Sequence, residues 1–283
     1  MFGNVGQDEI ASLRSQRRYR QLLLYKDILT NPCHIYIAMT ILMAIFLGAV
    51  QGLTEFLPVS SSGHLLMFQH FFGVPHNLLF DIMLHVATLC AVVWVFRQKI
   101  FGLVRKPLNK TNLCLLIATA ITCTMVLAYN PVMSVNILPI TFLITAIVLF
   151  ATTLIPKGTR THATAKSSAF IGFVQGIAVL PGISRSGSTI AAGLFTGTDR
   201  KSAAEFAFLM SIPIIIASLL FTLISNPTST ETLDFVPLIF GFITALFVGI
   251  FAIKFMLHVV QNIKLHYFSF YLVALSVALM LFL

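Results

Sequence analysis

The chain has 283 residues, of which 58% are hydrophobic and only 10% are charged, with a formal net charge of +9. Soluble globular proteins carry about 25% charged residues, so this composition excludes an ordinary cytosolic enzyme and a disordered chain. The positive charge does not indicate nucleic-acid binding, because the basic residues form short clusters between long apolar runs. Such clusters are typical of cytoplasmic flanks of membrane helices, so the sequence predicts an all-α polytopic membrane protein.

Residues 1–38 form a polar, basic N-terminal extension. A secretory signal peptide would need an apolar core and a cleavage site, and neither is recognisable in this segment. One interpretation is that translation begins at Met39 and that the extension is not translated. The remaining residues, 39–283, are predicted to form a single integral membrane domain.

The apolar runs predict the membrane segments, since a spanning helix needs about 20 mostly apolar residues. Two stretches, about 35–73 and 168–198, are interrupted by Gly, Pro and Ser and are poor single spans. Interrupted helices at membrane depth line cavities and often form binding sites. The six predicted spanning helices are 78–96, 112–129, 137–155, 203–224, 236–257 and 267–283.

Loop charges predict a topology, because cytoplasmic loops carry an excess of Lys and Arg. Segments 97–110, 156–166 and 254–266 are basic and are predicted to be cytoplasmic. Segments 130–136 and 225–235 contain no Lys or Arg and are predicted to be external. These assignments alternate consistently along the predicted spanning helices.

The two interrupted stretches contain an internal repeat. Residues 44–63 and 168–187 align without a gap at an offset of 124 and are identical at 8 of 20 positions. This match predicts a duplication with repeats over about 44–96 and 168–224. The helix after the first copy ends at a basic segment and the helix after the second at an acidic one, which predicts an inverted arrangement. Inverted repeats with broken or re-entrant helices place their site where the breaks meet.

Ionisable residues within these apolar stretches predict the site, because a charge inside a membrane is costly and indicates function by default. Glu55 and His64 lie in the first break and Arg185 lies in the second. Arg185 offers a planar fork of donors for phosphate oxygens. His64 can act as acid, base or nucleophile near neutral pH. These residues predict phosphoryl transfer on a lipid phosphate whose tail stays in the bilayer.

The same residues allow other interpretations. Gln51 lies one helical turn before Glu55, and together they could supply oxygens to a hard divalent cation. Glu55 and Arg185 could instead form a buried structural ion pair. The serines of the first break could cap a helix or form a turn.

Other ionisable residues in the apolar segments are interpreted as structural. Asp81 and Glu205 each open an apolar helix, where a carboxylate stabilises the N-terminal dipole. Three histidines have no catalytic or metal-binding pattern around them and are also interpreted as structural: His70, His76 and His85.

The two breaks read QGLTEFLPVSSSGH over residues 51–64 and PGISRSGST over residues 181–189. They resemble the two signatures of the undecaprenyl-diphosphate phosphatases of the bacitracin-resistance type. The resemblance runs from about residue 40 to the C-terminus. Many members of that family carry Glu where this chain has Gln51, so one carboxylate is missing here.

The resemblance implies removal of one phosphate from undecaprenyl diphosphate, which recycles the lipid carrier for peptidoglycan synthesis and confers resistance to bacitracin. It also implies a multi-pass protein of the bacterial inner membrane and a divalent cation, Mg²⁺ or Ca²⁺. The predicted partners are the isoprenyl diphosphate and membrane lipids, with a homodimer as a further possibility and no nucleic acid.

By position, the resemblance assigns Glu55 and Gln51 to metal and diphosphate binding and Arg185 to clamping the phosphate. His64 would be the acid–base group or nucleophile, and Ser61 is the other nucleophile candidate. The sequence does not choose between the two. The further predicted substrate-binding residues are Ser60, Ser62, Gly63, Ser184, Ser186, Gly187 and Thr189.

Two alternatives come from other protein classes. Type-2 phosphatidic-acid phosphatases share the local Ser-Gly-His and Ser-Arg groups, but they need a second His where this chain has Ala191 and an Arg-Pro motif that it lacks. A transporter or flippase of an isoprenyl phosphate carrier stays open, because inverted repeats with broken helices are a transporter design.

Overall fold

The computed structural model describes residues 39–74, 77–128, 134–225, 235–262 and 264–282. Within these ranges every regular element is helical, and the one β-type contact is an isolated bridge between Arg160 and Thr198. The predicted N-terminal extension, residues 1–38, lies outside the described residues. The described chain therefore has the all-α class that its composition predicts.

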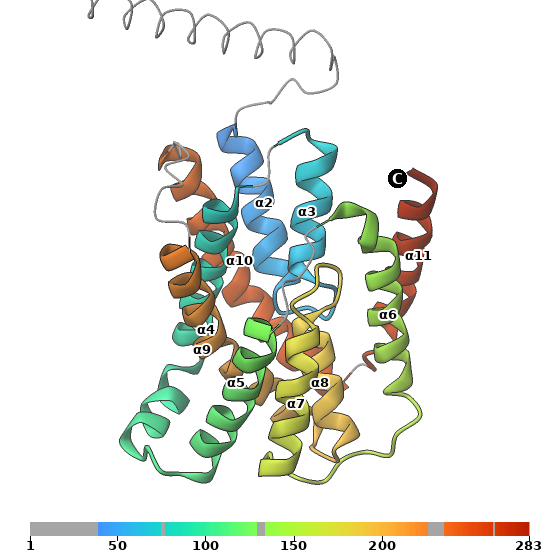
Figure 1. The fold of residues 1–283 in the computed structure, drawn as a ribbon. Coiled ribbons are helices and arrows are strands. Elements are labelled where there is room, and N and C mark those ends of the chain that lie inside the picture. Colours follow the sequence, from blue (N-terminus) through green and yellow to red (C-terminus); the bar gives the residue numbers. More distant parts are fainter. Residues whose placement is uncertain (1–38, 75–76, 129–133, 226–234, 263, 283) are drawn as a thin grey trace, which may run out of the picture.

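The helices follow one another in two similar series (Figure 1). The first series is α2 (Ile41–Thr54), α3 (Ser61–Phe71), α4 (Leu78–Arg105), α5 (Lys110–Ala128), the short 3₁₀ helix η1 (Val135–Ile137) and α6 (Leu138–Ala151). The second series is α7 (Ala165–Ile177), α8 (Arg185–Phe195), α9 (Arg200–Ser225), α10 (Phe235–Asn262) and α11 (Tyr267–Phe282).

Four of the described helices are long and apolar enough to cross a membrane: α4, α5, the Arg200–Phe221 part of α9, and α10. The helices α2, α6 and α11 are apolar but shorter. The chain is therefore that of a helical membrane protein. Two of the six predicted spans, 137–155 and 267–283, correspond to helices of only 14 and 16 residues.

Helix α4 is longer than the sequence predicts, because it continues through the basic segment to Arg105. Arg and Lys are good helix formers, so a basic segment need not be a loop. The Arg97 guanidinium lies 5.2 Å from the Trp94 ring centroid, and that of Arg105 lies 4.2 Å from the Phe101 ring centroid. Helix α10 likewise continues through Lys254. The predicted loop over 97–110 is therefore wrong as far as Arg105, whereas Lys254 lies within the predicted helix 236–257, which continues to Asn262.

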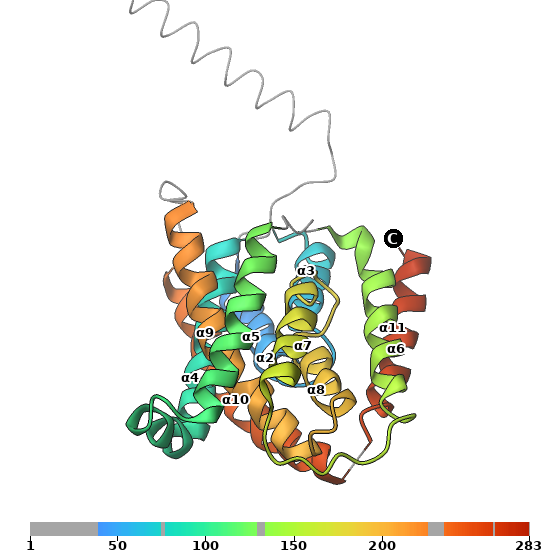
Figure 2. The same ribbon diagram turned by 60° about the horizontal axis from the view of Figure 1, so that its bottom comes forward.

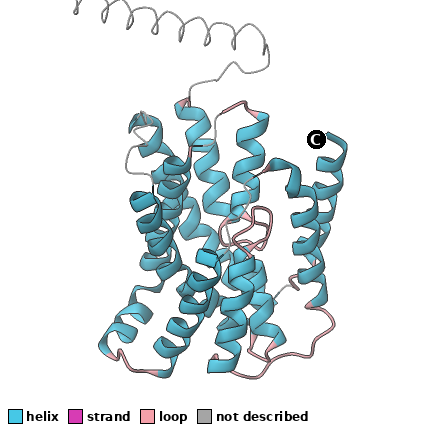
Figure 3. Ribbon diagram, viewed as in Figure 1, coloured by secondary structure: helices cyan, strands magenta, loops and turns pink. Residues whose placement is uncertain are grey.

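The two broken stretches enter the bundle from opposite ends. Helices α2 and α3 lie at one end, helices α7 and α8 lie at the other, and the loops within the two pairs meet near the middle (Figures 1 and 3). The Gly182 N–H donates to Ser60 Oγ at 3.1 Å, and Ser186 Oγ donates to the Leu57 carbonyl at 2.9 Å. The two loops are thus bonded directly to each other.

Local chemistry explains why both stretches break. Pro58 and Pro181 each lie four residues after the last residue of α2 and α7, in the turn that follows, where a proline has no N–H to continue the helix. Ser60 and Ser184 then cap α3 and α8, since each hydroxyl accepts a bond from the amide three residues later. The prediction that serines of the break cap a helix is therefore confirmed for Ser60. The caps fix the first residues of α3 and α8 at the centre of the bundle.

Helices α6 and α11 lie side by side along one side of the bundle (Figures 1 and 2). Ser276 Oγ of α11 donates to the Pro139 carbonyl of α6 at 2.6 Å. This pair covers the side of α3 that faces away from α4. Tyr271 of α11 contacts His64 in the first turn of α3.

Candidate active site

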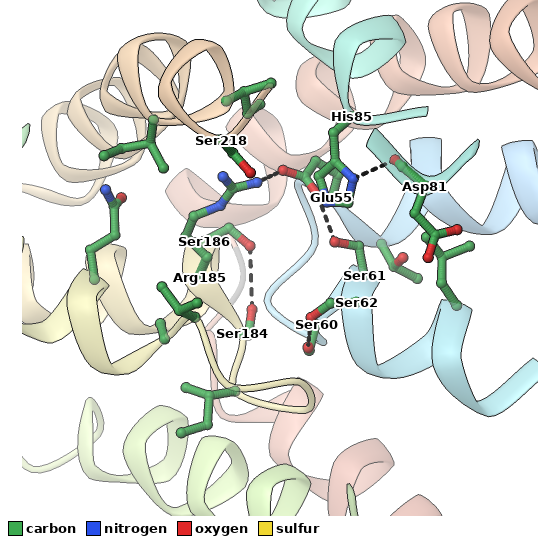
Figure 4. Close-up of a pocket in the computed structure, with 18 of the residues that line it drawn as sticks. Glu55, Ser60, Ser61, Ser62, Asp81, His85, Ser184, Arg185, Ser186 and Ser218 are labelled. Atoms are coloured by element: carbon green, nitrogen blue, oxygen red, sulfur yellow. Dashed lines mark hydrogen bonds and ion pairs between the residues drawn. The ribbon is translucent and has the colours of Figure 1, made fainter. Parts of the chain in front are cut away.

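A cavity of about 230 Å³ lies where the two breaks meet helices α4 and α9. Figure 4 shows polar side chains from all of these elements pointing toward one another. The polar lining residues that it labels are Glu55, Ser60, Ser61, Ser62, Asp81, His85, Ser184, Arg185, Ser186 and Ser218. Charged and hydroxyl groups from separate parts of the sequence therefore share one buried space.

The Glu55 carboxylate is the centre of this cluster. Glu55 follows the last residue of α2 and is 6% exposed. Its Oε1 atom forms an ion pair with the Arg185 guanidinium, and Oε2 accepts from Ser61 Oγ at 2.6 Å (Figure 4). Oε2 also accepts from Gln51 Nε2 at 3.0 Å. The structure thus brings together the carboxylate of the first break and the guanidinium of the second.

Arg185 is the first residue of α8, and its side chain lines the cavity with 22% of its surface exposed. A guanidinium carries five N–H donors. A single carboxylate partner therefore leaves donors for phosphate oxygens in the same space. The ion pair is consistent with both interpretations of Arg185. It can be a structural partner of Glu55, or a phosphate-binding group that contacts Glu55 before the substrate binds.

His85 of α4 is a site residue that the sequence analysis missed. Its Nε2 atom lies 3.6 Å from Glu55 Oε2, and its Nδ1 atom lies 2.7 Å from the Asp81 carbonyl oxygen (Figure 4). A carbonyl only accepts, so Nδ1 carries the hydrogen and Nε2 faces the carboxylate. The available signal was its position one turn after Asp81, in the helix that follows the first break.

The two helix-opening carboxylates have different surroundings. Asp81 lies in the first turn of α4 as predicted, but it is also buried in the cavity wall and accepts from Gln69 Nε2 at 2.7 Å. Glu205 lies beyond the first turn of α9 and pairs with Lys99 at 2.6 Å. The helix-dipole interpretation is therefore wrong for Glu205, whose partner comes from the extended basic end of α4.

His64 is buried away from the cavity lining. Its Nδ1 atom lies 2.7 Å from the Ser60 carbonyl oxygen, and its Nε2 atom lies 2.7 Å from the Tyr271 hydroxyl of α11. Nδ1–H therefore donates to Ser60, and the tyrosine O–H donates to Nε2. The ring also stacks on Tyr271 with centroids 5.8 Å apart. The structure does not bring His64 to Glu55 and Arg185.

The Ser-rich turns supply part of the predicted substrate site. Hydroxyl groups of both turns line the cavity, whereas the glycines hold the turns together. A Cβ at Gly63 would lie 2.8 Å from Gly182 Cα, and one at Gly187 would lie 3.0 Å from Pro58 Cβ. The predicted binding residues outside the cavity lining are Gln51, Gly63, Gly187 and Thr189.

The residues predicted to hold a divalent cation do not form such a site by themselves. Gln51 is fully buried behind Glu55 and presents its amide N–H to the carboxylate, and both carboxylate oxygens face donors. In the described part of the chain no group of three or more His, Cys, Asp or Glu side chains could hold a metal ion. The divalent cation stays a prediction, and its candidate ligand oxygens are the Glu55 carboxylate and the buried Gln51 Oε1, which accepts no hydrogen bond.

The fold and the cavity define a helical membrane protein with a charged, hydroxyl-rich site between two helix breaks. Residues 44–278 match the family described as Bacitracin resistance protein BacA, and the chain belongs to this family. It is similar to the undecaprenyl-diphosphatase of Treponema denticola, with 42% identity over 86% of this chain and 98% of the relative. It is also similar to the undecaprenyl-diphosphatase of Carboxydothermus hydrogenoformans, with 38% identity over 84% of this chain and 95% of the relative. The corresponding values for the undecaprenyl-diphosphatase of Methanobrevibacter smithii are 36% identity over 82% of this chain and 94% of the relative.

Proposed function

We propose that the protein hydrolyses undecaprenyl diphosphate to undecaprenyl phosphate and inorganic phosphate. Family membership and the names of its relatives support this activity. The observation that carries it is the cluster of Ser61, Glu55 and Arg185 in one cavity, which joins a nucleophile, a proton acceptor and a phosphate-binding cation. The activity recycles the lipid carrier for peptidoglycan synthesis and confers bacitracin resistance.

Ser61 is the better of the two nucleophile candidates. Its hydroxyl lines the cavity and already donates to Glu55 Oε2, the geometry that a serine needs for activation by a base. His64 does not line the cavity, and both of its ring nitrogens are already hydrogen-bonded, to the Ser60 carbonyl and to the Tyr271 hydroxyl. The Nδ1–H of His64 holds the carbonyl of Ser60, the residue before Ser61, so His64 is a positioning residue in this mechanism.

In the reaction, Arg185 binds the terminal phosphate and leaves Glu55 free to take the proton of Ser61. The serine oxygen attacks the terminal phosphorus, and undecaprenyl phosphate leaves. Arg185 neutralises charge on the phosphate oxygens inside the helical bundle, where such a contact is stronger than in bulk water. The remaining turn serines line the cavity as hydrogen-bonding groups for the diphosphate.

The two series of helices are proposed to be inverted repeats. Helices α2 and α7 begin 124 residues apart, and α3 and α8 begin and end at the same offset, which is the offset of the sequence match. Gly48 of α2 packs against the α10 backbone at Gly241, and the equivalent Gly172 of α7 packs against the α5 backbone at Ala118. Equivalent helices thus pack on equivalent partners.

The protein is further proposed to be a multi-pass protein of the bacterial inner membrane, with broken helices that re-enter the side from which they came. The basic ends of α4 and α10 would then lie in the cytoplasm. The opposite placement of the α2/α3 and α7/α8 pairs in the bundle supports this arrangement (Figure 1). The whole of residues 39–283 is proposed to form one membrane domain.

The deciding experiment is phosphate release from isoprenyl diphosphates by protein purified in detergent. A phosphatase turns over without a sealed membrane, whereas a flippase or transporter of the lipid carrier has no measurable action there. The same assay with a chelator tests the predicted Mg²⁺ or Ca²⁺ requirement. The size of the purified protein in detergent tests the predicted homodimer.

A further inference from the structure

We infer that His85 stores the proton of Ser61 while the phosphate is bound to the enzyme. This role rests on the proposed function and adds a second proton acceptor to Glu55. The sequence motifs do not include His85, which belongs to the membrane helix that follows the first break.

The geometry places one carboxylate oxygen between the serine and the imidazole. Glu55 Oε2 accepts the Ser61 hydroxyl at 2.6 Å, and the same oxygen lies 3.6 Å from His85 Nε2 (Figure 4). Because Nδ1–H is bonded to the Asp81 carbonyl, the atom that faces the carboxylate is the one that can gain or lose a proton. A proton can therefore pass from Ser61 through Glu55 to His85.

The charged groups around His85 favour this use. Glu55 comes from the end of α2, Asp81 from α4 itself and Arg185 from α8, and all three line the cavity with His85. When Arg185 binds the phosphate, the Glu55 carboxylate remains beside the imidazole, and the Asp81 carboxylate lines the same cavity. An imidazolium next to carboxylates is stabilised by their charge.

The proposed reaction needs such a store because its two steps use the proton in opposite directions. In the first step the Ser61 Oγ–P bond forms, the bridging P–O bond breaks, and the electron pair leaves with undecaprenyl phosphate. The serine proton moves through Glu55 to His85 Nε2. The enzyme now carries a phosphoserine and one extra proton.

In the second step a water oxygen bonds to phosphorus and the Ser61 Oγ–P bond breaks. A serine alkoxide leaves poorly, so the proton on His85 returns through Glu55 to Ser61 Oγ. Both water protons stay on the released phosphate, and the enzyme regains its starting protonation state. No oxidant, reductant or further reactant is required.

The test compares His85→Gln with wild type and with His70→Gln, the same change at an exposed histidine of α3. Phosphate release from an isoprenyl diphosphate is measured in detergent across pH 5–9, beside melting of each protein. We expect His85→Gln to lose about 10²-fold in turnover, the scale of general acid–base catalysis. It should also lack the fall in kcat/KM that wild type shows as pH drops through the range where imidazole titrates. His70→Gln should match wild type.

A His85→Gln protein within about threefold of wild type, or one that keeps the same fall near neutral pH, would overturn the inference. If this variant does not fold, His85→Ala with added imidazole replaces it. Recovery of turnover by imidazole in His85→Ala but not in Ser61→Ala supports the store, and no recovery in a folded protein contradicts it. Failure of the proposed function would look different, because wild type itself would then release no phosphate.

Discussion

The two breaks have the same backbone plan but carry different chemistry. Each pairs a proline-containing turn with a serine cap at the start of a short helix. At the offset of 124, however, Glu55 corresponds to Val179 and Ser61 corresponds to Arg185. One copy supplies the carboxylate and the hydroxyl, and the other supplies the cation. The site therefore arises from divergence of the two copies, because neither break contains all three groups.

The helices that follow the breaks differ in the same way. Asp81 of α4 lies in the cavity wall, whereas the equivalent Glu205 of α9 pairs with Lys99 outside that cavity. His85 of α4 faces Glu55, whereas the equivalent position of α9 is Leu209, which is 3% exposed in the apolar core. The first repeat therefore carries the carboxylates and the imidazole of the site, and the second contributes Arg185 and hydroxyl groups.

The largest expected effect is a complete difference in cysteine labelling between the two sides of the membrane, which tests the inverted arrangement of the two repeats. In a cysteine-free background, a cysteine at Leu108, which is 98% exposed between α4 and α5, should label from one side of the membrane. A cysteine in segment 225–235 should label only from the other side. Intact cells treated with an impermeant maleimide provide the measurement, and labelling of both positions from one side would contradict the inversion.

Next in size is the loss of the nucleophile of the first break. Ser61→Ala should reduce phosphate release by at least about 10³-fold, because removal of a nucleophile removes the chemical step itself. Ser168→Ala is the control, since Ser168 is a fully buried serine of the second copy outside the cavity lining. Substantial turnover by Ser61→Ala would point to water or another nucleophile.

The Arg185 guanidinium of the second break should contribute to turnover through its planar shape as well as its charge. Arg185→Lys keeps +1 but loses the planar fork, and should lose roughly 2–4 kcal/mol of transition-state stabilisation. Turnover is measured beside thermal melting in detergent. If the ion pair with Glu55 is only structural, the activity loss should follow a loss of folding, since a stranded buried charge costs about 3–5 kcal/mol.

The smallest expected effect concerns the contact between α11 and the first break. Tyr271→Phe removes the donor to His64 Nε2 and should lower the free energy of unfolding by about 1 kcal/mol. Most of the turnover should remain, because His64 positions Ser60 rather than reacting. Thermal melting and phosphate release measure the two effects. A loss of turnover as large as that of Ser61→Ala, with unchanged melting, would place His64 in the chemistry.

The helical membrane class, the two breaks and the main charged pair can all be predicted from the amino-acid sequence. Long apolar runs with few charges have one physical outcome, a bundle of membrane helices. Proline and serine end and start helices through local backbone chemistry, so Pro58, Ser60 and their counterparts located the breaks. Glu55 and Arg185 stood out because a charge in an apolar segment is costly. The end of α4 lies beyond the predicted span, because basic residues mark a membrane boundary but do not end a helix.

Which histidine faces the reacting groups depends on helix packing and cannot be predicted from the sequence. Proximity in sequence favoured His64, three residues after Ser61, but packing against Tyr271 of α11 holds its ring outside the cavity lining. His85 reaches Glu55 because α4 packs beside the end of α2 and a carbonyl in its own helix fixes the ring. The physical reason is that hydrogen-bond partners and helix packing orient a side chain, and both come from segments distant in sequence.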